Sequence, residues 1–360
     1  MTALALARSV QPGAIATLRP DDRRYAAFSA DHAFASLFTS AHWLSALEDA
    51  YGLEIEIAAI ERDGQLTAAI PYCRIDDLRG RRLVAPPFSD YGDPLASDPA
   101  DLGRLLDHLA GFERGLRLRT LRNPLPAADP RLEAKGQAFW HGIDLGPSLD
   151  ALWAGLDGSA RQNSRKAERS GVTVRIGKEV ADLRLFHAMH AQLRKAKYRM
   201  LAQPFALFTA IRDRFTAPPG SAGDVVVVLA EADGQPIAGI LLILWRGTAY
   251  YKFNASFDTR LRPNDLLTWH AMRYAKDRGC GWFDFGISDT DQPGLVRYKR
   301  KFATEEKTMR QLVRPPTRSP EPHEQAAAAN LGRLTELLTR PEVPDDVTRE
   351  AGDVLYRYFA

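Results

Sequence analysis

The sequence has 360 residues, which corresponds to about two globular domains at roughly 150 residues each. Its apolar fraction of 45% and charged fraction of 26% are those of globular proteins and exclude a disordered or fibrous chain. The 48 Lys and Arg exceed the 45 Asp and Glu by only three charges. Attraction to nucleic acid or to a membrane would therefore need local clusters of charge.

The cysteines and the apolar segments indicate a compartment. Cys73 and Cys280 are too few for a disulfide framework or a cysteine metal site, which is typical of a reducing environment. The apolar stretch 3–7 has no basic region before it, and the most apolar segment, 225–245, contains charged residues. We therefore expect no secretory signal, no membrane span and a cytoplasmic location.

An Asp-Gly turn occurs twice in similar surroundings. Asp63 and Gly64 lie between two apolar runs, and Asp233 and Gly234 lie between two others, 170 residues later. Because Asp and Gly tolerate positive φ, each turn predicts a β-hairpin. The flanking apolar runs are residues 55–60, 66–75, 225–230 and 237–245.

A helix, a glycine and a strand follow each predicted hairpin. Gly115 and Gly279 stand where a helix needs a left-handed residue to end, so both are predicted C-caps. The same order of elements at nearly the same spacing indicates two copies of one α/β unit. The helices are predicted at 105–114 and 266–278 and the strands at 116–121 and 282–285, with three more helices at 160–170, 180–194 and 205–215.

Six short segments resemble the FemAB-like and CelD-like acyltransferases of the GNAT (N-acyltransferase) superfamily. They are Pro-Pro-Phe-Ser-Asp-Tyr-Gly at 86–92, Arg-Gln-Asn-Ser-Arg-Lys-Ala-Glu at 161–168, Tyr-Tyr-Lys-Phe-Asn-Ala-Ser at 250–256, Arg-Pro-Asn-Asp-Leu-Leu-Thr-Trp at 262–269, Trp-Phe-Asp-Phe-Gly at 282–286 and Gly-Leu-Val-Arg-Tyr-Lys-Arg-Lys-Phe at 294–302. Ala303 stands where that family commonly has glycine.

The resemblance implies an α/β fold of two tandem GNAT-like domains, each a mixed sheet flanked by helices. We place a degenerate first domain at 1–147 and an acyltransferase domain at 148–314. Residues 315–360 begin with several prolines and continue into a predicted helix at 326–338, so they form a helical appendage.

The resemblance also implies that an activated acyl or aminoacyl group passes to the amine of a cell-envelope, peptidoglycan or polysaccharide precursor. The donor would be an aminoacyl-tRNA or an acyl-coenzyme A, with no permanently bound cofactor. An acetyl-coenzyme A-dependent N-acetyltransferase of a small or glycan amine is an alternative, and a non-catalytic nucleic-acid or partner-binding module is another. The acceptor would lie between the strands at 250–256 and 282–286, where the sheet of this superfamily splays.

Three residues are candidates for catalysis. Lys299 matches the family's aromatic-lysine segment and could hold a donor phosphate or stabilise an oxyanion, although it lies in a run of basic residues that is typical of a solvated helix face. Asp284 lies in an apolar strand and is either a general base or, as we favour, a structural clamp. Tyr251 lies in the motif strand at 250–256.

Donor or substrate binding is expected from a second group. The segment 161–178 is strongly basic and could grip a diphosphate or a tRNA backbone, or only keep the protein soluble. The segment 260–264 occupies the position of the coenzyme A diphosphate loop but has a proline and no glycine, which weakens that donor. The predicted binding residues are Arg161, Asn163, Lys166, Arg260, Asn264 and Tyr298. His187 and His190 lack carboxylate or cysteine partners in the sequence, so no metal is expected.

Overall fold

The computed structural model describes residues 13–216, 223–257 and 259–360. The apolar stretch 3–7 lies outside them. The first unit contains β1 (Ala14–Leu18), α1 (Arg23–Asp31), η1 (Leu37–Thr39), α2 (Ala41–Tyr51), β2 (Ile55–Arg62), β3 (Gln65–Asp77), β4 (Gly80–Ala85), α3 (Pro99–Ala110), β5 (Gly115–Thr120), α4 (Leu125–Ala128) and β6 (Glu133–Asp144).

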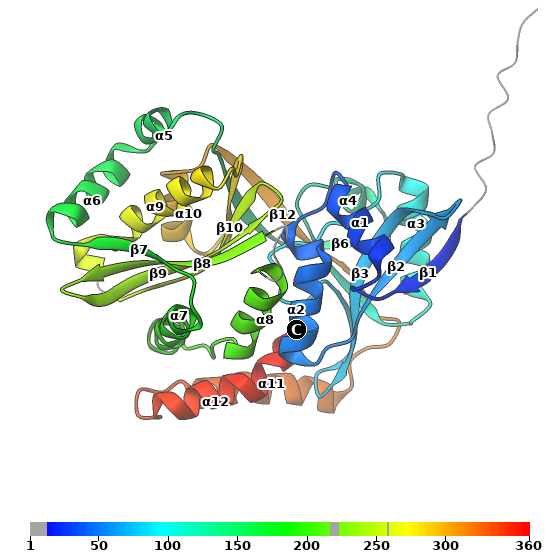
Figure 1. Cartoon of the computed structure of the whole chain (residues 1–360). Coiled ribbons are helices and arrows are strands. Elements are labelled where there is room, and N and C mark those ends of the chain that lie inside the picture. Colours follow the sequence, from blue (N-terminus) through cyan, green and yellow to red (C-terminus); the bar gives the residue numbers. More distant parts are fainter. Residues whose placement is uncertain (1–12, 217–222, 258) are drawn as a thin grey trace, which may run out of the picture.

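The second unit repeats this order of elements and is followed by a helical tail, residues 315–360 (Figure 1). It contains α5 (Leu149–Gly155), α6 (Gly158–Arg169), β7 (Thr173–Gly177), α7 (Val180–Leu193), η2 (Arg194–Tyr198), α8 (Phe205–Thr216), β8 (Gly223–Ala232), β9 (Gln235–Trp245), β10 (Thr248–Ser256), η3 (Thr259–Leu261), α9 (Pro263–Asp277), β11 (Trp282–Asp289), α10 (Pro293–Arg300) and β12 (Glu305–Arg314). The tail contains α11 (Pro322–Leu338), α12 (Asp345–Leu355) and η4 (Tyr356–Phe359).

The strands form one 12-stranded mixed sheet in the order β1-β2-β3-β4-β5-β12-β6-β11-β10-β9-β8-β7. The last strand of each unit lies beside the other unit. β12 pairs with β5 of the first unit, and β6 pairs with β11 of the second. The two exchanged strands also pair with each other at the centre of the sheet. Each unit therefore completes the sheet of its partner, and the tandem α/β fold is confirmed.

Both Asp-Gly turns form the predicted hairpins. The φ values are 50° and 76° at Asp63 and Gly64, and 49° and 73° at Asp233 and Gly234. Two successive positive φ angles give the turn that matches the twist of the flanking strands. These turns join β2 to β3 and β8 to β9.

The two predicted glycine caps have different outcomes. Gly279 follows α9 with φ +79°, as predicted. The prediction for Gly115 was wrong, because α3 ends at Ala110, the left-handed residue is Glu113 at φ 54°, and Gly115 begins β5. At Gly115 an added Cβ would lie 3.1 Å from Pro316, so this glycine permits the close approach of the chain entering the tail.

Alternating side chains give the sheet two apolar faces. One face and the helices α2, α7 and α8 form a hydrophobic cluster shared by both units, in which Trp43 and Phe208 are fully or almost fully buried. On the other face, α9 covers the second unit and α3 covers the first. The shared cluster fixes the two units against each other.

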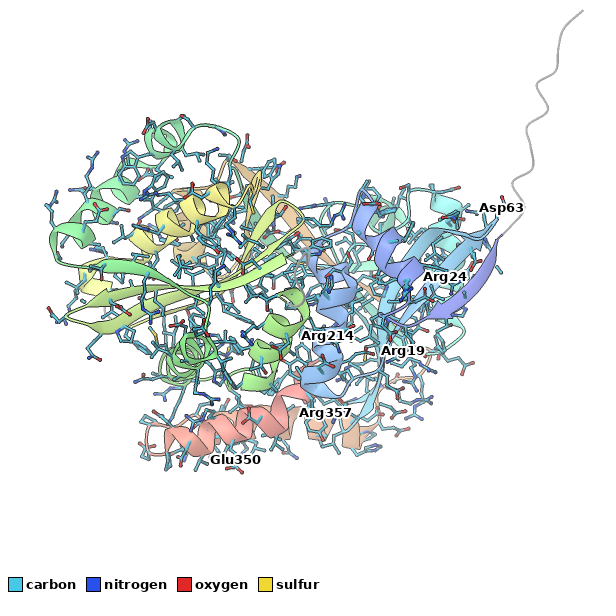
Figure 2. The ribbon with its side chains drawn as sticks, in the orientation of Figure 1. Arg19, Arg24, Asp63, Arg214, Glu350 and Arg357 are labelled. Atoms are coloured by element: carbon cyan, nitrogen blue, oxygen red, sulfur yellow. The ribbon has the colours of Figure 1, made fainter. Side chains whose placement is uncertain are left out.

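Contacts between α2 and α8 strengthen this junction. Arg214 donates to both carboxylate oxygens of Asp49 at 2.7 and 2.9 Å, and Figure 2 shows Arg214 where the two helices meet. The tail runs below α7, α8 and α2 in Figure 1. Its second helix, α12, and the end segment η4 lie beyond the helix predicted from the sequence, which corresponds to α11.

Candidate active site

Strands β10 and β11 separate part of the way along their length. They pair in parallel at Thr248–Trp282, Ala249–Phe283 and Tyr250–Asp284, and the pairing stops there. Beyond that point β10 stays with β9, whereas β11 pairs with β6. A cavity of about 670 Å³ opens at the separation, in the predicted place. It is lined by Asp90, Lys197, Tyr198, Tyr251, Lys252, Asn254, Asn264, Phe285, Gly286, Ile287, Gln292, Gly294, Leu295, Tyr298 and Lys299.

Backbone irregularities on both strands shape this cavity. The pairing of β10 with β9 shifts register between Tyr251 and Phe253, and that of β11 with β6 shifts between Asp284 and Ile287. Gly286, inside the second shift, has φ +71°. Such bulges redirect side chains near functional sites. Here the first bulge includes Lys252, which lines the cavity.

Two lysines and an aspartate from three separate elements meet at the cavity. Lys252 Nζ lies 2.6 Å from Asp90 Oδ1, and its side chain is only 6% exposed. Lys299, on α10, is 5% exposed and donates to the carbonyl of Ile287 at 2.7 Å. Gly286 lies close to both Asp90 and Lys299. A Cβ added to it would lie 3.3 Å from Asp90 Oδ2 and 3.8 Å from Lys299 Nζ.

The environment of Lys299 changes its acidity. Burial lowers the pKa of this lysine to about 8, because a low-dielectric surrounding disfavours the charged form. The carboxylates of Asp90, Asp284 and Asp289 oppose the decrease, and Lys252 adds to it. Lys299 can therefore change charge close to neutral pH, as groups at catalytic sites commonly do.

Asp284 lies beneath the cavity and links the two units. Its side chain is 3% exposed, accepts a hydrogen bond from the Tyr91 hydroxyl at 2.6 Å and accepts another from the Gly286 N–H at 2.8 Å. Burial raises the pKa of Asp284, and the bonds from Tyr91 and Gly286 oppose that change. The carboxylate thus fixes the bulged Gly286 against the first unit. Its hydrogen-bond partners are this hydroxyl and this backbone N–H rather than a lysine or arginine, and its roles as general base or clamp stay predictions.

Three other predicted residues line the same cavity. The Tyr251 ring packs edge-on against Phe285 at a centroid distance of 4.9 Å. The Tyr298 hydroxyl donates to the carbonyl of Asn264 at 3.0 Å and lies 2.8 Å from the Thr268 hydroxyl. Burial raises the pKa of both tyrosines, so their hydroxyls stay protonated. Tyr251, Asn264 and Tyr298 therefore form an aromatic and amide wall around Lys299.

The remaining predicted residues lie outside the lining of this cavity. Arg161 donates to the carbonyls of Ala154 and Trp153, and Asn163 donates to Asp265 at 3.2 Å. Lys166 is exposed on α6, and Arg260 is exposed on η3. Three of these residues lie on α6, which packs against α9, and Arg260 lies on η3, directly before α9.

The two histidines considered as a ligand pair are part of the packing of α7. Nε2 of His187 lies 2.9 Å from the Gln203 carbonyl, and Nε2 of His190 lies 2.8 Å from the Gln203 side-chain oxygen. Burial lowers the pKa of both imidazoles, to about 3 at His190. Both rings contact the phenyl ring of Phe208.

Sequence reasoning missed Asp90 and Lys252 as site residues. Asp90 lies in the segment 86–92, which carried part of the resemblance without a role, and Lys252 lies beside the predicted Tyr251. A charged residue within an apolar motif was the available signal for both. Tyr198, which is 48% exposed at the cavity, gave no signal because η2 is a π-helical turn after α7.

Comparisons with known proteins agree with this geometry. Residues 157–300 match the family model of the acetyltransferase (GNAT) domain. No curated protein matches the sequence. Among solved structures, FemX is similar over 82% of this chain and 96% of its own, with 14% identity and a TM-score of 0.61.

Two further solved structures have the same architecture. L-PGS from Bacillus licheniformis is 16% identical and covers 89% of this chain and 98% of its own, with a TM-score of 0.54. A tandem GNAT protein from the clavulanic acid biosynthesis pathway is 11% identical and covers 85% and 99%, with a TM-score of 0.55. Identities this low show a shared fold.

Within the described residues, every helix is too short or too polar to cross a membrane. The helices of the second unit instead pack around a splayed sheet with a buried lysine at its opening. Residues 157–300 thus match the acetyltransferase (GNAT) domain, and the chain shares its tandem fold with FemX and the tandem GNAT protein.

Proposed function

We propose that the cavity between β10 and β11 is where this protein transfers an acyl or aminoacyl group to an amine. The observation that carries the proposal is the opening of the sheet after Tyr250 and Asp284, with Lys299, Lys252 and Asp90 around it. A groove that excludes water and orients two reactants supplies a large part of the barrier reduction in such reactions.

In the proposed reaction the neutral amine attacks the carbonyl carbon of the donor. A C–N bond forms, and the bond to the leaving oxygen or sulfur breaks. The amine proton leaves with the departing alcohol or thiol, or with solvent. The Lys299 ammonium stabilises the oxyanion that develops on the carbonyl, an effect that is strong where water is excluded. The Lys252–Asp90 ion pair positions the opposite wall, and Asp284 holds Gly286 in place.

We favour an aminoacyl-tRNA as the donor. Helix α9 begins at Pro263, after Arg262 in the left-handed region, so its first position lacks an N–H and its entry has no glycine. A glycine-rich helix entry is what brings a diphosphate close to the backbone N–H groups. Arg165, Lys166 and Arg169 are exposed on the nearby α6, and a polyanion can contact such a face.

Acetyl-coenzyme A remains the second candidate donor. The matching family model is that of an acetyltransferase domain. The name of the similar tandem GNAT structure specifies that it was solved without AcCoA, which names that donor for the neighbour. We propose that the acceptor is an amine on a cell-envelope or polysaccharide precursor. The similarity to FemX and to a lysylphosphatidylglycerol synthetase domain supports this class. Cys73 and Cys280 are buried free thiols, which fits the cytoplasmic location that we propose.

Separate incubations with charged tRNA and with acyl-coenzyme A, followed by mass spectrometry of candidate amines, test this proposal. We expect an acylated amine with charged tRNA and none with a Lys299→Ala variant. A product only with acyl-coenzyme A would select the second donor. Steeply salt-dependent tRNA binding, with no product from either donor on any amine, would contradict catalysis and favour a binding module.

A further inference from the structure

A second cavity, of about 340 Å³, lies where the first unit, the second unit and the end of the tail meet. It opens where β4 ends, next to β5, and η4 contributes one wall. Asp90 and Lys252 line both this cavity and the candidate active site. The other lining residues are Tyr51, Val84, Ala85, Pro86, Phe88, Ser89, Arg117, Arg119, Gln203, Leu207, Phe253, Gln311, Tyr356, Phe359 and Ala360.

Two arginine side chains at the cavity have few hydrogen-bond acceptors within the protein. On β5, Leu116 and Leu118 face the core, so Arg117 and Arg119 project from the opposite face. Within the described part of the chain, the guanidinium of Arg117 makes no hydrogen bond or ion pair, and that of Arg119 donates only to the carbonyl of Ser89, at 3.2 Å. Two planar guanidinium groups on one strand face thus remain free to bind an anion.

Tyr51 adds a buried aromatic ring to one wall of the cavity. This residue is 5% exposed and lines the cavity, and its buried hydroxyl has no hydrogen-bond partner among the described residues. The hydroxyl is covered by protein, and its titratable neighbours are Tyr356 and Arg194.

The positive charge of this region exceeds the negative charge available to it. Asp90 is paired with Lys252 at 2.6 Å, and Asp77 accepts two hydrogen bonds from Arg82, at 2.8 and 2.9 Å. Burial lowers the pKa of Arg117, and the neighbouring Arg82 and Arg119 lower it further. The second of these effects is the repulsion between neighbouring cations.

We propose that this cavity binds a phosphate-bearing ligand through Arg117 and Arg119. Guanidinium groups bind phosphate oxygens in pairs of parallel hydrogen bonds. Phe88 lies against Tyr51 at a ring distance of 4.3 Å and gives the cavity an aromatic side. Arg117 and Arg119 do not line the candidate active site, so this proposal does not depend on acyl transfer there.

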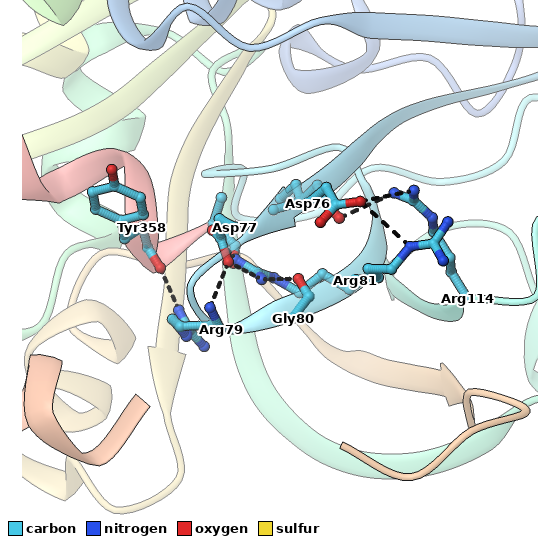
Figure 3. A network of polar contacts seen from close by, with 10 residues as sticks. Asp76, Asp77, Arg79, Gly80, Arg81, Arg114 and Tyr358 are labelled. Carbon is cyan, nitrogen blue, oxygen red and sulfur yellow. Dashed lines mark hydrogen bonds and ion pairs between the residues drawn. The ribbon is translucent and has the colours of Figure 1, made fainter. Parts of the chain in front are cut away.

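The tail forms part of the proposed site. Arg79, in the turn between β3 and β4, donates to the carbonyl of Tyr358 at 2.5 Å, and Figure 3 shows it between Asp77 and Tyr358. Arg82 donates to the carbonyl of Ala360 at 3.1 Å. Tyr356 packs against Phe88 and Tyr51. A ligand in the cavity would therefore contact the tail and reduce its motion.

Calorimetric titration of the whole chain with inorganic pyrophosphate tests the proposal. Arg117→Gln and Arg119→Gln should each weaken binding at least tenfold, and Tyr51→Phe should leave it unchanged. The matched control is Arg310→Gln, because Arg310 is exposed on β12 and points away from the face of its neighbour Gln311. Hydrogen exchange in 356–360 should slow when pyrophosphate binds to the wild type.

Vesicles with and without phosphatidylglycerol distinguish a lipid headgroup from a soluble phosphate. Binding that requires phosphatidylglycerol, Arg117 and Arg119 would support the site with a lipid source, and pyrophosphate binding with the same dependence would support a soluble one. The proposal is overturned if neither probe binds, or if Arg310→Gln weakens binding as much as Arg117→Gln. Normal acyl transfer in the Arg117→Gln variant would leave the proposed function intact in either case.

Discussion

The two units place different chemistry at the same point of the sheet. In the second unit, β10 and β11 separate after Tyr250 and Asp284, and the opening holds a buried lysine. In the first unit, β4 pairs with β5 only as far as Ala85 and then ends, and the tail helps to close the adjacent cavity. In our two proposals one fold position reacts in the second unit and binds a ligand in the first, because different side chains line it.

The difference arises from burial. Lys299 is 5% exposed and has a lowered pKa, so it can gain or lose its proton near neutral pH. Arg117 and Arg119 are exposed in their cavity, and a guanidinium stays charged at any ordinary pH. The cavity with Arg117 and Arg119 is therefore suited to holding an anion. The cavity with Lys299 is suited to stabilising the oxyanion that forms transiently during the reaction.

The largest expected effect comes from removing the lysine of the second unit. Lys299→Ala should lower kcat by about 10²–10³-fold, the usual cost of losing one oxyanion partner. Arg297→Ala is the control, because Arg297 is exposed on the same helix, α10. Steady-state kinetics with the donor that the incubations select measures both. Equal activity of the two variants would place the reaction elsewhere.

A smaller effect is expected from cutting the link between the units. Asp284→Ala leaves the Tyr91 hydroxyl and the Gly286 N–H without their acceptor, which should cost about 1–3 kcal/mol of unfolding free energy. Chemical denaturation of Asp284→Ala, Tyr91→Phe and the double variant gives the coupling between the pair. Additive losses would show that the 2.6 Å contact does not hold the units together.

A still smaller effect separates backbone strain from site geometry. Gly286 and Gly279 have φ values of 71° and 79°, so alanine at either should cost about 1–2 kcal/mol. Only at Gly286 would the added Cβ meet the site, 3.3 Å from Asp90, whereas at Gly279 nothing lies within 4 Å. Thermal melting should therefore show similar losses, with impaired transfer only in Gly286→Ala. Impaired transfer in both would implicate strain alone.

Much of the fold follows from local chemistry. The Asp-Gly turns specify two hairpins, and Gly279 ends α9, because each requires positive φ at that residue. Gly115 was misassigned since its glycine serves a close approach by Pro316, 201 residues later in the chain. The exchange of β6 and β12 was also hidden, because side-chain alternation shows that a strand exists but does not identify its neighbours.

The site was predictable where a residue opposed its surroundings. Lys299 lies three residues after the buried Val296, so helical spacing places it on the inner face of α10, unlike its exposed basic neighbours Arg297 and Arg300. Asp284 stood out in an apolar strand in the same way. Asp90 comes from the other unit, and only the assembled fold brings it to Lys252.

The pH dependence of kcat tests the central claim, that the Lys299 ammonium acts in the second-unit opening. Burial lowers the folded-state pKa to about 8, so the charged form dominates below that pH and is lost above it. We predict that kcat falls as pH rises through about 8. In Lys299→Arg, whatever activity remains should show no such fall, because arginine stays charged. A wild-type kcat that rises through pH 8, or the same fall in Lys299→Arg, would contradict this role for Lys299.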